Sequence, residues 1–148
     1  MTIRIYLDSN VFIDAFENDD VPVTRGRRVL DHVRNGGAIG VISELVVAEL
    51  LTKPLENDDA EMYEAYVSLF DSSRTIETHP IDQRVLVRAA RLRATVKSLK
   101  MPDAIHAATA QIQGCAGFVT ADRRLLSALG INAVPLDSST VDNIRALA

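Results

Sequence analysis

Short stretches of alternating apolar and polar residues predict strands along this chain, and longer stretches with helical periodicity separate them. Ile3, Ile5 and Leu7 alternate with Arg4 and Tyr6 and predict a first strand that ends before Asp8. Further strands are expected at residues 38–42, 75–78, 118–120 and 132–136. Helices are expected through residues 12–16, over 24–34, 43–51, 57–70, 82–98 and 102–114, from Asp122 to a stop at Gly130, and from Ser139 onward.

Regular exchange between strands and helices predicts a parallel sheet with helices on both of its faces. We therefore expect an α/β/α sandwich around four or five parallel strands, built as a single domain from residues 1–148. In such sheets, ligands bind beyond the carboxyl ends of the strands. Asp8 and Asp122 each follow a predicted strand, so this edge of the sheet is the first place to look for a site.

Composition narrows the possible functions. A hydrophobic fraction of 47% over 148 residues is ample for one core, and the single cysteine excludes an intrachain disulfide. The formal charge of −4 gives no support for bulk nucleic-acid binding, so any RNA contact needs a local basic patch. The N-terminus lacks a signal-peptide pattern, and no apolar stretch approaches the ~20 residues of a membrane span. We expect a cytoplasmic protein without membrane contact.

Four acidic residues stand where a metal-dependent nuclease would need carboxylates. Each has a simpler explanation: Asp8 and Asp122 suit helix N-caps, Asp103 suits a first helical turn, and Glu49 suits a solvated helix position with Glu44 as a competitor. Taken together they indicate a shared cation site, because Mg²⁺ prefers oxygen ligands. A cation held there can activate water and neutralise charge on a phosphoryl group.

The histidines do not form a recognisable metal motif. His32, His79 and His106 have no zinc-ligand spacing with Cys115, and all three are expected to be structural. His106 follows Asp103 by three residues, which places both on one face of the predicted helix.

A basic stretch with no acid in it precedes Asp103. Its residues form two stripes at helical spacing, which either contact RNA phosphates or make a solvated helix face. The first stripe is Arg84, Arg88 and Arg91, and the second is Arg93, Lys97 and Lys100.

The local phrases around the four acids resemble those of PIN domains. Residues 8–14, DSNVFID, resemble the opening motif, and residues 43–50, with Ala-Glu-Leu at their end, resemble the second acidic motif. Residues 102–108, PDAIHAA, resemble the third motif, and residues 118–122, FVTAD, resemble the fourth. The resemblance covers essentially the whole chain in the order typical of the family.

This resemblance implies a metal-dependent endoribonuclease and, for a chain of this size, a VapC-like toxin of a bacterial toxin–antitoxin pair. It implies Ser9 and Thr120 as supporting residues, and RNA, a cognate antitoxin and a second copy of the chain as partners. It makes the same four acids both the catalytic residues and the ligands of Mg²⁺ or Mn²⁺: Asp8, Glu49, Asp103 and Asp122.

Two other functions stay open. A phosphohydrolase with an aspartyl nucleophile resembles Asp-x-Asp after its first strand, but Asn10 stands at the third position here and the general acid would be missing. A non-catalytic module that binds only RNA or protein would not need the acidic set, and metal titration separates it from a nuclease.

Overall fold

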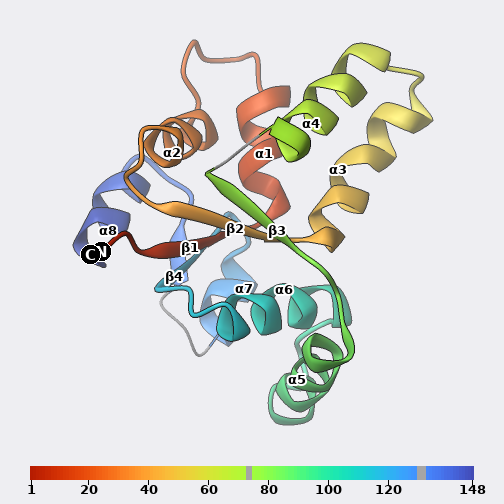
Figure 1. The fold of residues 1–148 in the computed structure, drawn as a ribbon, viewed down its shortest axis with the longest axis vertical. Coiled ribbons are helices and arrows are strands. Elements are labelled where there is room, and N and C mark those ends of the chain that lie inside the picture. The colour runs from red at the N-terminus through yellow and green to blue at the C-terminus, as the bar shows by residue number, and fades with distance from the viewer. Residues whose placement is uncertain (73–74, 130–132) are drawn as a thin grey trace.

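A computed structural model describes residues 1–72, 75–129 and 133–148 and contains one five-stranded parallel sheet (Figure 1). The strand order is β3-β2-β1-β4-β5. The predicted α/β/α sandwich with four or five parallel strands is therefore confirmed. The strands are β1 (Arg4–Leu7), β2 (Ile39–Ser43), β3 (Ile76–His79), β4 (Gly117–Thr120) and β5 (Ala133–Pro135).

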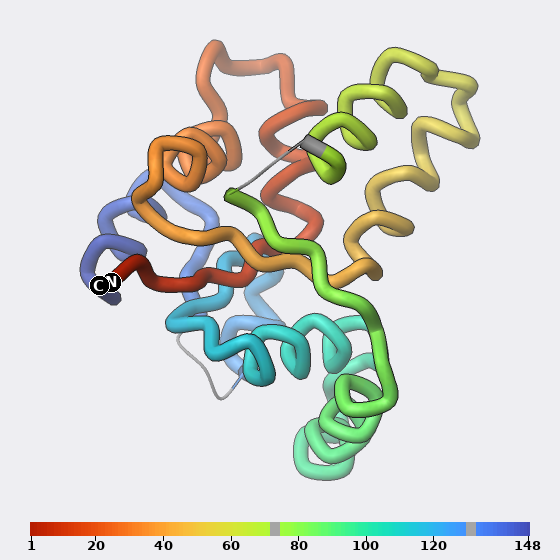
Figure 2. Tube along the Cα trace, in the orientation of Figure 1, coloured from red at the N-terminus to blue at the C-terminus, as the bar shows by residue number. Residues whose placement is uncertain are grey.

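Helices cover both faces of the sheet (Figure 1). α5 packs on α6, on the side of α6 that lies away from the sheet (Figure 2). None of the described helices is long and apolar enough to cross a membrane. The helices on one face are α1 (Ser9–Glu17), α2 (Arg25–Arg34), α3 (Glu44–Glu56), α4 (Ala60–Ser72) and α8 (Thr140–Ala146). Those on the other are α5 (Gln83–Thr95), α6 (Met101–Ile112) and α7 (Arg123–Ala128).

Two hydrophobic clusters flank the sheet because successive residues of a strand point to opposite faces. Ile5 and Leu7 of β1 belong to the cluster under α1 to α4 and α8, and both are fully buried. Tyr6, between them, belongs to the cluster under α5 to α7. Its ring stacks on that of its register partner Phe118 with the centroids 4.8 Å apart.

Helix α3 differs from its predicted extent. The Lys53-Pro54 pair was expected to end the helix, yet α3 runs on to Glu56 with Pro54 inside it. Because Pro54 lies in the last turn, it removes one donor while the Asn57 N–H still bonds the Lys53 carbonyl at 3.1 Å. Pro54 is also buried, so its ring adds apolar contact.

Helix ends elsewhere shift by a few residues. The helix expected over residues 82–98 ends at Thr95, and the one expected to begin at residue 57 begins at Ala60. Ser43 caps α3 and Thr24 caps α2, as their residue types predict. The expected stop at Gly130 and the start of the last strand at residue 132 lie outside the described residues.

Candidate active site at the carboxyl edge of the sheet

The strand order has a topological switch point at the carboxyl end of β1. β1 is paired with β2 on one side and β4 on the other, so the chain leaves the centre of the sheet in opposite directions there. Ligands of open parallel sheets bind outside such a point. The Asp8 N–H extends the β1–β4 ladder by bonding the Val119 carbonyl at 3.0 Å, which places Asp8 beside the end of β4.

Asp8 serves as a helix cap and also faces this edge. It is 7% exposed, and its Oδ1 accepts the Ser9 backbone N–H at 2.8 Å at the start of α1. Its Oδ2 accepts the Thr120 hydroxyl at 2.7 Å and the Asn10 amide at 3.2 Å. Both oxygens are therefore held, and the two residues expected to support the site, Ser9 and Thr120, both bond to Asp8.

Asn10 connects α1 to the loop that follows β4. Its amide donates to Thr120 Oγ1 at 3.2 Å, and its Oδ1 accepts the Ala121 N–H at 3.1 Å. Thr120 Oγ1 also accepts the Asp122 N–H at 3.0 Å. Asp122 caps α7, with its Oδ1 accepting the Arg124 N–H at 3.0 Å. The sequence had singled out Asn10 only as a departure from Asp-x-Asp, and its bridging role was missed.

Glu49 reaches the site from α3 and meets a histidine there. Its Oε1 lies 2.7 Å from His106 Nε2, and His106, on α6, is 1% exposed. The other ring nitrogen, Nδ1, lies 2.5 Å from the Tyr6 hydroxyl. The default assignment of His106 to a purely structural role therefore overlooked a direct contact with a candidate ligand. Its position one turn after Asp103 was the sequence signal for this contact.

Asp8, Glu49 and His106 form a compact set of groups able to hold a metal. One ligand atom from each lies within 4.8 Å of the others, and this is the one such group among the described residues. Of the four expected carboxylates, the set contains Asp8 and Glu49.

Asp103 lies close enough to these groups for their charges to alter its titration. The pKa of Asp103 is raised, first by burial and then by the negative charge of Asp8. The charges of Asp122 and Glu49 add smaller contributions in the same direction. Carboxylates that repel one another in this way suit a divalent cation, and their oxygens are the ligands that Mg²⁺ and Mn²⁺ prefer.

A cleft of about 460 Å³ adjoins the acids. Its lining includes the acids Asp103 and Asp122 and the basic residues Lys100 and Arg124. Positive side chains beside a carboxylate cluster are what a phosphodiester needs, since the cation and the basic residues share its charge.

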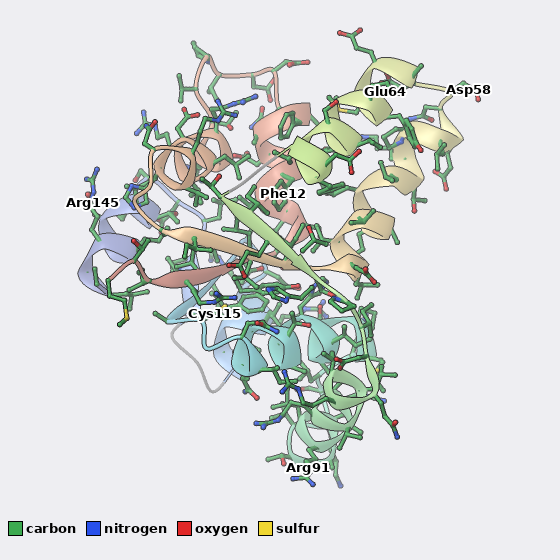
Figure 3. All side chains as sticks on the ribbon, in the orientation of Figure 1. Phe12, Asp58, Glu64, Arg91, Cys115 and Arg145 are labelled. Atoms are coloured by element: carbon green, nitrogen blue, oxygen red, sulfur yellow. The ribbon has the colours of Figure 1, made fainter. Side chains whose placement is uncertain are left out.

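The six basic residues of the stretch that precedes Asp103 lie in three different parts of the structure. Arg84, Arg88 and Arg91 line a separate depression of about 470 Å³ on α5, and Figure 3 shows Arg91 on the side of that helix away from the sheet. Arg93 Nε donates to the Leu99 carbonyl at 2.9 Å and so braces the turn between α5 and α6. Lys97 is exposed in that turn, and of the six residues only Lys100 lines the cleft beside Asp103.

A family model matches residues 5–146 and is described as the PIN domain. This chain belongs to the PIN-domain family. The match spans all four acids and His106, so the site described above lies inside the PIN domain. A search of curated proteins gave no match.

Solved structures with the same fold include several from toxin–antitoxin systems. VapBC2 of Rickettsia felis, solved with a DNA fragment from its promoter, superposes with a TM-score of 0.72 at 16% identity, over 91% of this chain and 100% of that chain. A toxin–antitoxin complex of Klebsiella pneumoniae gives 0.68 at 22% identity, over 90% and 98%. VapC20 of Mycobacterium tuberculosis, a toxin that cleaves the sarcin–ricin loop, gives 0.67 at 15% identity, over 86% and 95%. At these identities the likeness shows a shared fold.

Proposed function

We propose that this PIN domain is a metal-dependent endoribonuclease that hydrolyses RNA phosphodiester bonds. The observation that carries the proposal is the convergence of Asp8 and Glu49 at the carboxyl edge of the sheet, next to Asp103, whose pKa is raised by burial and then by the negative charge of Asp8. These residues come from β1, α3 and α6, and capping alone does not explain why they meet.

Asp8 and Glu49 would hold Mg²⁺ or Mn²⁺, with Asp103 and Asp122 completing the set around it. The ion supplies neutralising charge for the phosphoryl group and activates water. Asp8 is fixed by Ser9 and Thr120 and so presents its carboxylate in one orientation. Asp103 lines the cleft beside these ligands, so its carboxylate would orient the attacking water.

Lys100 and Arg124 would place the RNA. Both line the cleft that contains Asp103 and Asp122, so a phosphate bound by either would lie near the carboxylates. The second set of basic residues, on the outer side of α5, would contact more distant phosphates of a longer RNA.

The chemistry predicts the ends of the products. Attack by the ribose 2′-hydroxyl needs an exposed acid–base pair, whereas His106 is buried and bonded on both ring nitrogens. We expect 5′-phosphate and 3′-hydroxyl ends. EDTA should abolish cleavage, Mg²⁺ or Mn²⁺ should restore it, and Ca²⁺ should do so poorly because its coordination is looser. Cleavage in EDTA that leaves 2′,3′-cyclic phosphates would overturn the mechanism, and RNA binding without any cleavage would favour the non-catalytic module.

We further propose that the chain acts as the toxin of a toxin–antitoxin pair, with an antitoxin protein and a second copy of the chain as partners. The support is the fold shared with toxin–antitoxin complexes such as that of Klebsiella pneumoniae. Expression of the chain alone should slow bacterial growth, and co-expression of the protein encoded next to it should relieve the effect and yield a stable complex. Normal growth with an active nuclease would reject the toxin role and leave the nuclease standing.

A further inference from the structure

A row of hydrogen bonds runs from the protein interior to the candidate metal ligand Glu49. The Ser43 N–H donates to the Tyr6 oxygen at 3.1 Å, and Tyr6 lies 2.5 Å from His106 Nδ1. His106 Nε2 then lies 2.7 Å from Glu49 Oε1. Ser43 and Tyr6 are fully buried. Glu49, whose side chain is 35% exposed, is the only member of the row that solvent reaches appreciably.

Counting donors fixes the direction of every bond in this row. A backbone N–H can only donate, so Tyr6 oxygen accepts from Ser43. Within the described part of the chain, the other partner of the Tyr6 hydroxyl is His106 Nδ1, so the hydroxyl proton must go there. Nδ1 is then the acceptor nitrogen of a neutral imidazole, and the ring proton resides on Nε2, which donates it to Glu49.

The alternative, in which His106 itself binds the metal, leaves a buried group without a partner. A metal-binding Nε2 would have to lose its proton, and Nδ1–H would then donate to Tyr6 oxygen, which already accepts the Ser43 N–H. The Tyr6 hydroxyl proton would then be buried with no acceptor among the described residues, which is unfavourable. The donor count therefore favours His106 as a donor to a metal ligand.

We infer that Tyr6 and His106 are positioning residues that hold the Glu49 carboxylate in place for the cation. The inference rests on the metal site of the proposed function. A long glutamate side chain at a helix surface has many rotamers, and fixing it before the ion arrives lowers the entropy lost on binding. Hydrogen bonds to metal ligands typically change metal affinity by about 10–100-fold.

Ser43 connects the Tyr6–His106 hydrogen bonds to α3, the helix that carries Glu49. Its hydroxyl caps α3 by accepting the Leu45 N–H at 3.1 Å, while its own N–H bonds Tyr6. The same residue thus sets where α3 begins and where the Tyr6–His106 pair lies. Ser43 therefore helps to position both the helix backbone at Glu49 and, through Tyr6 and His106, the Glu49 carboxylate.

The test measures Mn²⁺ affinity by calorimetry on the whole chain without RNA. His106→Phe removes the donor and should weaken binding about 10–100-fold, whereas His106→Gln keeps a donor nitrogen near the place of Nε2 and should restore most of it. Tyr6→Phe should weaken binding by a smaller factor, because the Nε2–Glu49 bond survives without its support. The matched control is Thr109→Val, also buried in α6, whose hydroxyl bonds only the Ile105 carbonyl among the described residues and whose loss should leave the affinity unchanged.

Two outcomes separate failure of this inference from failure of the proposed function. If the wild type binds Mn²⁺ and Glu49→Gln weakens binding, but folded His106→Phe does not, the positioning role is wrong and the metal site stands. If the wild type binds no Mn²⁺, both are wrong.

Ring-nitrogen NMR of the unmutated protein gives an answer that does not depend on whether the variants fold. His106 should show a protonated Nε2 and an unprotonated Nδ1, and the Nε2 proton should persist when Mg²⁺ or Zn²⁺ is added. Loss of that proton on addition of either ion would make His106 a ligand and overturn the inference.

Discussion

The two faces of the sheet are built from the same strands but differ in chemistry. The face under α1 to α4 and α8 presents Ile5, Leu7, Ile42 and Val119, all fully buried and all apolar. The face under α5 to α7 combines Tyr6 and Phe118 with a buried histidine.

Strand alternation explains where the polar residues of the second face end up. Asp8 follows Tyr6 by two positions, Ser43 follows Val41, and Thr120 follows Phe118, so each polar residue continues the face that packs on α5 to α7. Each lies at the carboxyl end of its strand, where the ligand edge begins. The first face supplies apolar burial without polar interruption, and the second uses its buried hydrogen bonds to orient groups at that edge.

The largest expected effect concerns the acid at the end of β1. Asp8→Asn keeps an oxygen that can cap α1 but removes the charge, so the fold should persist and RNA cleavage should fall roughly a thousandfold, since a catalytic cation contributes several kcal/mol to charge stabilisation. Circular dichroism and single-turnover cleavage measure the two properties. The matched control is Glu64→Gln on α4, an exposed acid that Figure 3 shows far from the sheet. A comparable loss of activity in this control would show that net charge matters more than position.

Neighbouring residues of β1 allow the two faces to be compared directly. Ile5→Ala should lower the free energy of unfolding by about 2–5 kcal/mol through lost burial and a cavity, while Mn²⁺ affinity of the folded fraction stays unchanged. Tyr6→Phe should lower the free energy of unfolding by less, about 1–3 kcal/mol, because it leaves the Ser43 N–H and His106 Nδ1 without a hydrogen-bond partner. Unlike Ile5→Ala, it should also weaken Mn²⁺ binding. Urea unfolding in EDTA gives the stabilities. Equal effects of both changes on metal binding would remove the distinction between the faces.

The sequence was sufficient for the strands of the sheet and for two of the helix caps at its carboxyl edge. Alternation at Ile3, Ile5 and Leu7 located β1, and the capping preferences of Asp8 and Asp122 located two helix starts that the structure contains. Such signals are local, since each depends on a few neighbouring residues.

Contacts between distant parts of the chain could not be predicted from the sequence. Tyr6 and His106 meet across a separation of 100 residues, and only the packing of α6 on the face of the sheet that carries Tyr6 brings them together. The division of the basic stretch depends on α5 ending at Thr95, after which the turn carries Lys100 toward Asp103 and away from Arg84. Helical spacing alone had grouped Lys100 with Arg93 and Lys97 in one stripe.

A smaller effect is expected in the pH dependence of the metal-free protein. Because the pKa of Asp103 is raised in the folded state by burial and by Asp8, the folded protein holds this proton more tightly than the unfolded chain does. Stability from this group is therefore present at low pH and is lost as the pH rises from the ordinary value of 3.8 through the higher folded pKa. Asp103→Asn should remove that loss and leave the protein at least as stable as the wild type at pH 7.

Urea unfolding in EDTA between pH 3.5 and 7, for the wild type and Asp103→Asn, measures this difference. Adding Mg²⁺ at pH 7 should stabilise the wild type more than the variant, because the cation offsets the repulsion that the variant lacks. A variant that is markedly less stable at every pH would mean that Asp103 is mainly a first-turn helix acid of α6.

The smallest effect separates the two parts of the basic stretch. Lys100→Ala removes a positive charge from the cleft beside Asp103 and should weaken binding of a short single-stranded RNA about two- to fivefold, with the salt slope flattened by ~0.7 for one lost phosphate contact. Arg84→Ala, on the outer side of α5, should leave a short RNA unaffected and weaken only a longer one that can reach it. Filter binding at several salt concentrations, in Ca²⁺ to suppress cleavage, gives both quantities. Equal losses with the short RNA would place its path along α5, and the cleft would then not be the entry to the carboxylates.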